Sequence, residues 1–510
     1  MDTRLYSALL LMGALAAHAP DTPTGRHLIA SLDASGAGRR AVVGAHAGFQ
    51  APQASQAVKP SQASRAATSP AERQFRAWLD VFNRGNREEY LKFLRGNFPS
   101  READLDEDMN FTEATGGFDF RRMETAAATT LTCLVQERAS DQFARAEIEV
   151  EAAPPHRIVR VGLNAVPRPS EYPIPHLAEA DLIAALGKRL DREAAKDMFS
   201  GAVLVGRNGK VIFSAAYGPA DREKKIPNTL NTRFRMGSMN KMFTATATLQ
   251  LVRADKLKLT APLGQYLTDY PNKDIATKVT IHHLLTHTGG TGDIFGPEFS
   301  AHRLELRTLN DYVTLYGTRG LRFEPGAKWE YSNYGFLLLG VIIERVSGQS
   351  YYDYVRDHVF QPAGMASSGS EPEDQVVPDR SRGYMKETGI WTPNTATLPY
   401  RGTSAGGGYT TVEDLFRFAT ALTGHRLLNA HYTDLLTTGK VDAGERGKYA
   451  YGFVDGATGG ARSIGHGGGA PGMNGDLRIL PQSGYVVAAL ANMDSGASRA
   501  TEWVAARLPR

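Results

Sequence analysis

The sequence predicts an α+β protein with more than one folded unit. Its 510 residues exceed what a single average core can bury. A helical pattern followed by alternating strands occupies residues 70–165 and predicts a small α+β domain. Residues 176–510 contain a strand hairpin near their start, apolar helices, and two neighbouring strands near their end. We therefore expect a small α+β domain followed by a larger domain that mixes helices and strands.

The composition is that of a folded protein. With 42% hydrophobic and 22% charged residues, the chain is neither fibrous, collagenous nor wholly disordered. Lys and Arg number 58 against 54 Asp and Glu, a net charge of +4, and no basic run follows the chain, so no nucleic-acid partner is expected. The single cysteine, Cys133, excludes an intramolecular disulfide and a multi-cysteine metal site. Its apolar neighbours indicate a buried strand cysteine.

The first residues have the pattern of a secretory signal. Residues 5–17 are almost entirely apolar and lead into Ala17-His18-Ala19, which is typical of a signal peptide over residues 1–19. The apolar stretch is shorter than the about 20 residues of a membrane span. We expect a periplasmic or secreted protein with no membrane span once the signal is removed. A retained anchor or a wrongly chosen start codon is the alternative.

Residues 20–69 predict a disordered linker, because they are rich in Ala, Ser, Gln, Gly and Pro and show little apolar periodicity. Order is expected to begin at Ser69-Pro70-Ala71-Glu72, which has the pattern of a helix start. Strands are expected over 129–138, 145–151 and 157–163. This pattern of helices before strands over residues 70–165 resembles the nuclear transport factor two-like cone. No chemical constellation stands out there, so we interpret the domain as a spacer or packing module, with a ligand cone as the alternative.

A second linker, rich in proline, covers residues 166–175. An amphipathic helix is expected from Leu177 to Lys196, and strands over 199–206 and 211–217. Asn208-Gly209 lies between those strands and is the strongest short hairpin signal, because both turn positions need positive φ.

The first chemical motif is Ser238-Met239-Asn240-Lys241, followed by a helix of small and apolar residues. Residues three apart lie on the same side of a helix, and burial favours a neutral lysine that can accept the serine proton. The structural alternative is a capping serine and a lysine that reaches for solvent.

Two further motifs follow. Tyr331-Ser332-Asn333 precedes an apolar helix over 336–346, and its tyrosine can relay a proton while its asparagine can bind a substrate amide or ester. His466-Gly467-Gly468-Gly469 leads into strands over 476–480 and 485–490. Glycines on a strand allow close approach, and backbone N–H groups there can stabilise an oxyanion. Structural loops are the alternatives for both motifs.

In this order the three motifs resemble those of the β-lactamase and penicillin-binding-protein serine hydrolases, most closely the class C β-lactamase-like branch with its esterases and D-amino-acid peptidases. Similar supporting stretches are residues 199–205, 283–290 and 405–409. The resemblance covers about residues 176–510. It implies a β-lactamase/transpeptidase-like fold, in which a mostly antiparallel sheet flanked by helices is joined to an all-helical subdomain, with a final helix over 498–508 packed on the sheet.

The resemblance also implies roles for individual residues. Ser238 would be the acylated nucleophile, Lys241 and Tyr331 the proton-shuttling pair, and Asn333 a substrate contact. The N–H groups of Ser238 and Gly469 would form the oxyanion hole, with His466 and Gly468 in the substrate-binding strand. No cofactor or metal is implied, and family precedent favours a monomer.

The third motif departs from the β-lactamase pattern, in which Lys and then Thr or Ser precede the glycine. His466 carries no fixed charge above about pH 6.5, and Gly467 has no side-chain donor. We therefore expect hydrolysis of small esters or short D-amino-acid peptides and amides. A β-lactamase or D-alanyl-D-alanine carboxypeptidase is the first alternative, and a non-catalytic binding protein with the same fold is the second.

Several other polar residues have simpler interpretations. His282, His283 and His287 lack the pattern of a zinc site and are expected to fix a loop near the pocket, which Asp293 and Trp391 are expected to line. Glu413 and Asp414 are interpreted as a helix start rather than as catalytic carboxylates.

Overall fold

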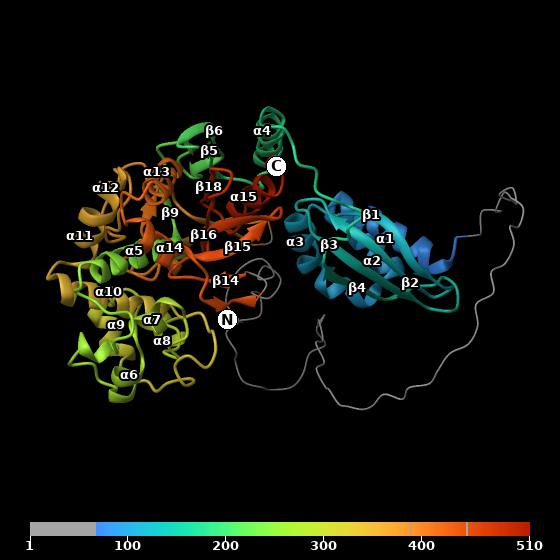
Figure 1. The fold of residues 1–510 in the computed structure, drawn as a ribbon. Coiled ribbons are helices and arrows are strands. Elements are labelled where there is room, and N and C mark those ends of the chain that lie inside the picture. The colour runs from blue at the N-terminus through green and yellow to red at the C-terminus, as the bar shows by residue number, and fades with distance from the viewer. Residues whose placement is uncertain (1–67, 388, 445–446, 510) are drawn as a thin grey trace, which may run out of the picture. The chain divides into compact units, whose positions relative to one another are not determined.

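The computed structural model describes residues 68–387, 389–444 and 447–509. The described residues form two units, one up to Tyr172 and one from Pro173 onward (Figure 1). The predicted signal peptide and the linker up to residue 67 lie outside the described residues. Across the described ranges, no helix is both long enough and apolar enough to cross a bilayer.

The first unit is a four-stranded antiparallel sheet in the order β1-β2-β3-β4, packed against helices. Ser69 caps the first helix by accepting a hydrogen bond from the backbone N–H of Glu72, and Phe75, Trp78 and Phe82 of that helix are buried. Its elements are α1 (Pro70–Arg84), α2 (Arg87–Asn97), η2 (Pro99–Asp104), α3 (Leu105–Thr115), β1 (Phe118–Ala126), β2 (Thr130–Glu137), β3 (Phe143–Val150) and β4 (Ile158–Val166).

Three of these strands match the sequence predictions, whereas β1 was not predicted. The β1–β2 register shifts between Phe120 and Arg122 and again between Met123 and Thr125. Such bulges break the regular alternation that identifies a strand in a sequence. Cys133 lies in β2 and is fully buried, as expected, and burial raises the pKa of its thiol to about 12. The similarity of this unit to a nuclear transport factor two-like cone stays a prediction.

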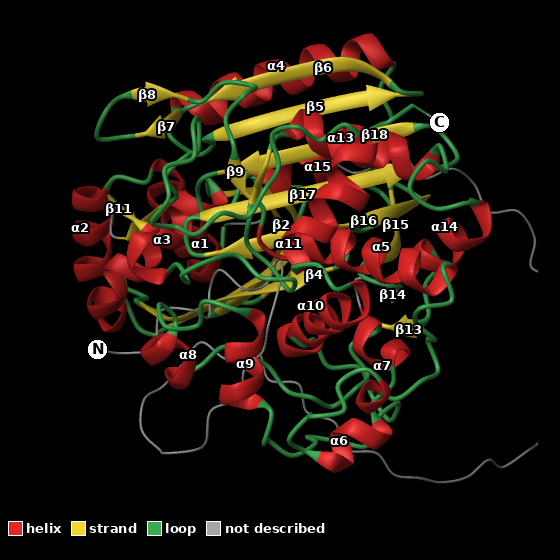
Figure 2. Cartoon of the chain, turned by 90° about the vertical axis from the view of Figure 1, so that its left-hand side faces the viewer, coloured by secondary structure: helices red, strands yellow, loops and turns green. Residues whose placement is uncertain are grey.

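The second unit is built around an eight-stranded antiparallel sheet in the order β13-β14-β15-β16-β17-β18-β5-β6. Figure 2 shows β6, β5, β18, β17 and β16 side by side in this order. The strands are β5 (Gly201–Arg207), β6 (Lys210–Tyr217), β13 (Val441–Asp442), β14 (Lys448–Tyr449), β15 (Val454–Thr458), β16 (Ala461–Ala470), β17 (Met473–Leu480) and β18 (Tyr485–Ala491). The predicted hairpin is confirmed, with Asn208 and Gly209 at φ 49° and 75° between β5 and β6.

Helices cover both faces of this sheet. Along β5, Val203 and Val205 pack with α4 (Glu179–Ala195) and α15 (Ala497–Ala505). The alternate residues Ala202 and Leu204 belong to the larger core that holds α5 (Asn240–Arg253) and α13 (Val412–Thr423). Alternation along a strand thus places two apolar layers against opposite faces.

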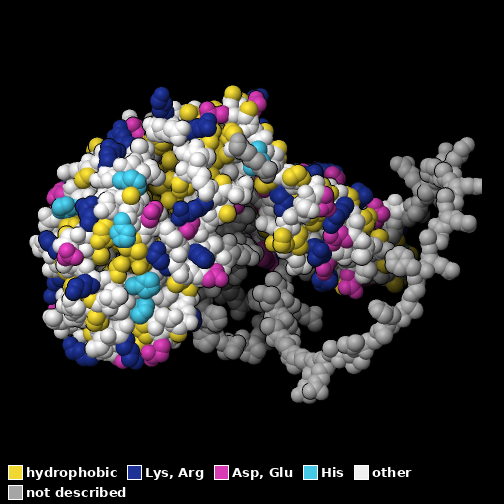
Figure 3. Space-filling view, viewed as in Figure 1, with side chains coloured by type: hydrophobic (Ala, Val, Ile, Leu, Met, Phe, Trp, Pro, Cys, Tyr) yellow, Lys and Arg dark blue, Asp and Glu magenta, His cyan; other side chains and the backbone are white. Residues whose placement is uncertain are grey.

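The predicted all-helical part lies between α5 and the C-terminal strands. It comprises η4 (Leu263–Gln265), α6 (Lys273–Lys278), α7 (Ile281–Leu285), α8 (Pro297–His302), α9 (Leu309–Tyr316), α10 (Asn333–Ser347), α11 (Tyr351–Val355), η5 (Arg356–Phe360) and α12 (Gln361–Ala363). Outside it are η3 (Gly237–Met239), η6 (Asn394–Thr397), α14 (Ala430–Thr437), and the short strands β7 (Pro219–Asp221), β8 (Ile226–Pro227), β9 (Phe234–Arg235), β10 (Tyr384–Glu387), β11 (Ile390–Pro393) and β12 (Tyr409–Thr410). Acidic and basic side chains are interspersed on the face of the molecule shown in Figure 3.

Candidate active site

Ser238 lies in the short helical turn η3, between strand β9 and helix α5. Gly237 has φ 53°, a left-handed conformation that glycine adopts without strain. Two backbone hydrogen bonds hold the turn: Gly407 N–H donates to the carbonyl of Gly237 (3.1 Å), and Met236 N–H donates to that of Gly408 (3.3 Å). The Ala405–Tyr409 stretch therefore supports the backbone directly before the serine.

Lys241 lies one turn further along, at the start of α5, and is fully buried. Its Nζ lies 3.4 Å from Oγ of Ser238 and 2.7 Å from Oδ1 of Asn333, and it donates to the carbonyl of Ala405. The same nitrogen lies 4.7 Å from the centroid of the Tyr331 ring. Four residues of the predicted site, from two separate motifs, therefore come together around one ammonium group.

Burial controls the charge of this lysine. Removal from water lowers the pKa of Lys241 to about 7, and the nearby carboxylate of Asp293 opposes this effect. A lysine with this pKa is partly neutral at neutral pH and can then accept a proton from a hydroxyl group. The structural alternative, a lysine that reaches for solvent, is wrong, because Lys241 is fully buried.

The Tyr331–Asn333 motif is fixed at the N-terminus of α10. Ser332 caps the helix by accepting from Gly335 N–H (2.9 Å), and Asn333 is the first helical residue. The ring of His287 accepts a hydrogen bond from Ser332 N–H (3.1 Å) and packs 4.3 Å from the Tyr331 ring. His287 therefore fixes this loop.

The other two predicted histidines also make structural contacts. Nδ1 of His283 accepts from Thr280 N–H (3.3 Å), and Nδ1 of His282 lies 2.8 Å from the Tyr451 hydroxyl. Among the described residues, no group of three or more His, Cys, Asp or Glu side chains has an arrangement that would hold a metal ion.

The third motif forms the second half of strand β16. Pairing with β15 ends at Gly465, so β15 does not cover the edge of β16 at residues 466–470. This edge lies against η3: a Cβ atom on Gly468 would overlap the carbonyl oxygen of Met236, and one on Gly237 would lie 2.9 Å from the backbone nitrogen of Gly469. The glycines thus bring the edge of the sheet next to the Ser238 turn.

His466 is nearly buried on the same strand, with 7% of its surface exposed. Its Nε2 lies 3.1 Å from the hydroxyl of Tyr449, and its ring centroid lies 6.4 Å from that of Tyr331. Tyr449 also packs 4.5 Å from the His287 ring. Sequence reasoning missed Tyr449, because β14 is only two residues long and gives no pattern to detect.

Asp293, which was expected to line the pocket, contacts Asn333. Its Oδ1 accepts from Asn333 N–H (3.0 Å) and its Oδ2 accepts from Nδ2 of Asn333 (3.2 Å). Burial raises the pKa of the Asp293 carboxyl, and the hydrogen bonds from Ile294 and Asn333 together with Lys241 oppose this rise.

The structure thus brings the three motifs together: a buried lysine lies beside a serine at a helix start, Tyr331 and Asn333 lie at the N-terminal end of α10, and the glycine-rich edge of β16 lies against η3. Comparison with known sequences decides the family, because the Beta-lactamase family description matches residues 181–509. The chain belongs to the beta-lactamase family.

Within the family, the chain is similar to proteins that are named for different activities. Esterase EstB of Burkholderia gladioli is 34% identical over 40% of this chain and 56% of its own length. A penicillin binding protein from Bacillus halodurans is 37% identical with a TM-score of 0.57, covering 61% of this chain and 97% of that structure. A D-stereospecific amidohydrolase from Streptomyces sp. is 27% identical with a TM-score of 0.54, covering 62% and 97%. The chain spans 56–64% of the length of three curated relatives.

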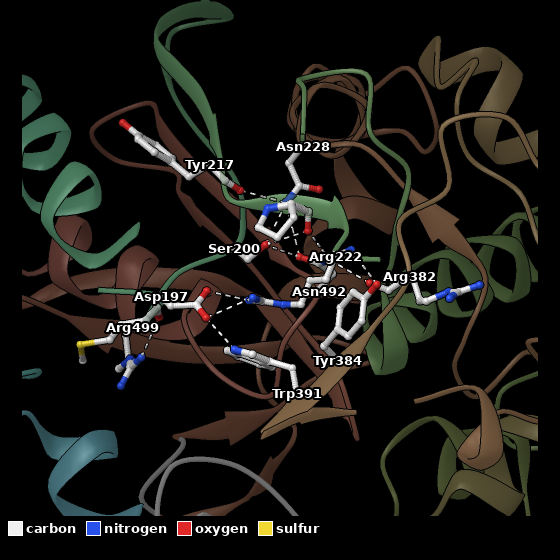
Figure 4. A network of polar contacts seen from close by, with 12 residues as sticks. Asp197, Ser200, Tyr217, Arg222, Asn228, Arg382, Tyr384, Trp391, Asn492 and Arg499 are labelled. Carbon is white, nitrogen blue, oxygen red and sulfur yellow. Dashed lines mark hydrogen bonds and ion pairs between the residues drawn. The ribbon is translucent and has the colours of Figure 1, made fainter. Parts of the chain in front are cut away.

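Asp414 and Trp391 make none of the contacts around Lys241 described above. Asp414 accepts from Ser367 N–H (2.7 Å) and lies in the first turn of α13, which Thr411 caps, as expected for a helix start. Trp391, by contrast, belongs to a separate polar network: its Nε1 donates to Asp197 (2.6 Å), and the guanidinium carbon of Arg222 lies 3.8 Å from its ring centroid (Figure 4).

Proposed function

We propose that the chain is a serine hydrolase that forms an acyl-enzyme on Ser238 and acts on small esters or short D-amino-acid peptides and amides. The observation that carries the proposal is the fully buried Lys241, whose Nζ lies 3.4 Å from the Ser238 hydroxyl. A neutral amine at this position is a general base within reach of the nucleophile.

In the proposed acylation, Oγ of Ser238 attacks the acyl carbon of the substrate while its proton moves to Nζ of Lys241. The tetrahedral oxygen accepts hydrogen bonds from the N–H groups of Ser238 and Gly469, a contribution whose loss costs about 3 kcal/mol per donor. As the bond to the leaving group breaks, Tyr331 donates its proton to the departing oxygen or nitrogen and receives the proton that Lys241 took from Ser238. The negative charge thus develops at backbone dipoles rather than in water.

In the proposed deacylation, a water molecule attacks the Ser238 ester and its proton passes to the Lys241–Tyr331 pair. The pair returns this proton to Oγ as the bond between Oγ and the acyl carbon breaks, which releases the acid and restores the serine. Asn333 has one amide hydrogen directed to Asp293 and its oxygen directed to Lys241. Its second amide hydrogen remains to donate to a substrate carbonyl.

Two observations support esters or amides as substrates. The chain is similar to a protein named as an esterase and to one named as a D-stereospecific amidohydrolase. The strand edge beside Ser238 has His466 and Gly467 where a lysine and a hydroxyl residue would help bind the carboxylate of a β-lactam.

A β-lactamase or D-alanyl-D-alanine carboxypeptidase is the second candidate. The observation in its favour is the 37% identity to the penicillin binding protein of Bacillus halodurans. It requires Ser238 to be acylated by penicillin despite the altered third motif.

We further propose that the protein is exported to the periplasm or the medium and works as a monomer on small molecules. The support for export is the apolar stretch over residues 5–17 followed by Ala17-His18-Ala19. Cell fractionation tests this location, and a cytoplasmic protein of full length would contradict it.

The experiment is a substrate panel run on the wild type and on Ser238→Ala. It contains p-nitrophenyl butyrate, D-alanine amide and a fluorescent penicillin. Hydrolysis of the ester or the amide that disappears in Ser238→Ala supports the first candidate. Stoichiometric labelling by penicillin without turnover of the other two supports the second. Equal rates in both proteins, or no reaction with any probe, would contradict the serine hydrolase proposal and favour a binding protein.

A further inference from the structure

We propose that Asp293 is a positioning residue that fixes the orientation of the Asn333 amide and thereby the acceptor presented to Lys241. This inference rests on the proposed function, because it concerns how the general base of Ser238 is held. The residue lies in the loop between α7 and α8 and is brought to the site by its contacts with the first residue of α10.

Both oxygens of the Asp293 carboxylate accept hydrogen bonds from Asn333, and one also accepts from Ile294. Oδ1 accepts from the backbone N–H groups of Ile294 (2.8 Å) and Asn333 (3.0 Å), and Oδ2 accepts from Nδ2 of Asn333 (3.2 Å). An N-terminal residue of a helix has a backbone N–H with no partner inside the helix, so the carboxylate also satisfies the start of α10.

The carboxylate decides which end of the Asn333 amide faces the lysine. An ionised carboxylate only accepts hydrogen bonds, so it selects the amide nitrogen of Asn333. The oxygen of the same amide is then directed to Lys241, where Oδ1 lies 2.7 Å from Nζ. A lysine ammonium only donates, so the reversed amide would place two donors face to face. Asp293 therefore acts on Lys241 through one rigid amide group.

The negative charge of Asp293 also favours the protonated form of Lys241. It opposes the loss of the proton that burial favours and so keeps the Lys241 pKa from falling further. Other polar and aromatic groups face this pair. The groups around Lys241 are Ser238, Tyr331, Asn333, Phe336 and the Ala405 carbonyl. Near Asp293, Arg319 donates to the backbone carbonyl of Asp293 (3.0 Å), and the Tyr316 hydroxyl donates to the carbonyl of Ile294 (3.1 Å).

The test measures the second-order rate constant for labelling of Ser238 by a fluorophosphonate as a function of pH. If neutral Lys241 is the base, wild-type labelling rises with pH through the Lys241 pKa. In Asp293→Asn, the lost negative charge and a reversed Asn333 amide both favour neutral lysine. We expect this rise to move to lower pH by about 1 pH unit, an opposite charge being lost from the site.

A charge-swapped variant should shift the pH profile of labelling in the opposite direction. In Asp293→Asn combined with Asn333→Asp, the carboxylate lies directly beside Nζ while the amide at position 293 donates to it. The ammonium form is then stabilised, and we expect the rise in labelling to move to higher pH by about 1 pH unit. A purely structural role of Asp293 would move the profile in neither direction.

The matched control is Asp414→Asn, because Asp414 is also a buried carboxyl whose pKa burial raises, and it likewise accepts from backbone and side chain near a helix start. Its labelling profile should keep the wild-type midpoint. Thermal unfolding of each variant checks folding, and the charge-swapped variant decides the question if Asp293→Asn does not fold. Unchanged midpoints in the folded variants would overturn the role of Asp293 alone. A wild type that is not labelled at Ser238 would overturn the proposed function as well.

Discussion

Two polar networks in the same unit differ in whether their cation is paired with a carboxylate. Around Lys241, the ammonium is fully buried and makes its contacts with neutral groups, and its pKa falls to about 7. In the network of Figure 4, Arg222 makes two hydrogen bonds to the carboxylate of Asp197, at 2.7 and 3.0 Å, and lies over the Trp391 ring. The second network compensates its cation directly, whereas the first leaves its cation close to losing a proton.

The serines of the two networks show the same contrast. Ser200 is buried, lies 2.8 Å from Asn492 Oδ1, and accepts from Nδ2 of Asn228 at 3.0 Å. Ser238 is only half-buried, and its Oγ lies 3.4 Å from the ammonium of Lys241. The two serines therefore differ in the exposure of their hydroxyl and in the group beside it, and the residue type alone does not distinguish them.

The largest expected effect separates the two serines. Ser238→Ala should lower ester hydrolysis by about 1,000-fold or more, because no nucleophile remains. Ser200→Ala should keep kcat and lower the free energy of unfolding by about 1–2 kcal/mol, because buried amides lose a partner. Steady-state kinetics and thermal unfolding on both variants check this. A Ser200→Ala enzyme as inactive as Ser238→Ala, while still folded, would remove the contrast.

A second test concerns the strand edge beside Ser238. Gly468→Ala should lower kcat by about 100-fold, the scale of a lost oxyanion donor, because its Cβ would overlap the Met236 carbonyl and push β16 away from η3. Gly467→Ala is the matched control, since its Cβ would come no closer than 3.5 Å to Asp476. Comparable kinetics of the two variants would argue against close approach of β16 as the requirement.

A third prediction follows from the charge of Lys241. Because the neutral form is the base, kcat/KM should rise with pH through a midpoint of about 7 and fall about tenfold per pH unit below it. The pH dependence of kcat/KM for p-nitrophenyl butyrate measures this midpoint. A flat profile between pH 5 and 9, at about constant kcat/KM, would show that a buried lysine is not the base.

The smallest expected effect lies in the compensated network. Arg222→Met should lower the free energy of unfolding by less than about 1 kcal/mol, because the lost ion pair with Asp197 is partly exposed to solvent. The activity should stay within about twofold of the wild type, since this network supplies no reacting group. Chemical denaturation and kcat, measured on one preparation, check the expected stability and the expected activity. A large loss of kcat would show that the Arg222 network affects the Lys241 site.

The predictable parts of this molecule are those written in local sequence. The hairpin at Asn208-Gly209 follows from the φ values that only a few residue types adopt, and the neighbourhood of Ser238 and Lys241 follows from one turn of helix. The fold class of the second unit was also predicted, through the order of three short motifs, and the match to residues 181–509 confirms it.

The rest depends on contacts between distant residues. Asp293 and Asn333 are 40 residues apart, and Tyr449 contacts His466 from a strand of two residues. No helical or strand periodicity in the sequence therefore predicts either contact. Strand β1 was missed because its bulges interrupt the alternation of apolar and polar residues. Trp391 was predicted to line the pocket because the sequence does not show that its partner is Asp197. Local patterns therefore locate the residues of the candidate site, while the orientation of their side chains comes from tertiary packing.

In the proposed mechanism, the buried Lys241 makes Ser238 the residue that becomes acylated. The most direct measurement mixes the protein with p-nitrophenyl acetate, stops the reaction with acid, and locates the acetyl group by peptide mass spectrometry in the wild type and in Lys241→Met. We predict an acetyl group on the peptide that contains Ser238 in the wild type and none there in Lys241→Met. Acetylation at another residue, or equal acetylation of Ser238 in both proteins, would contradict the account.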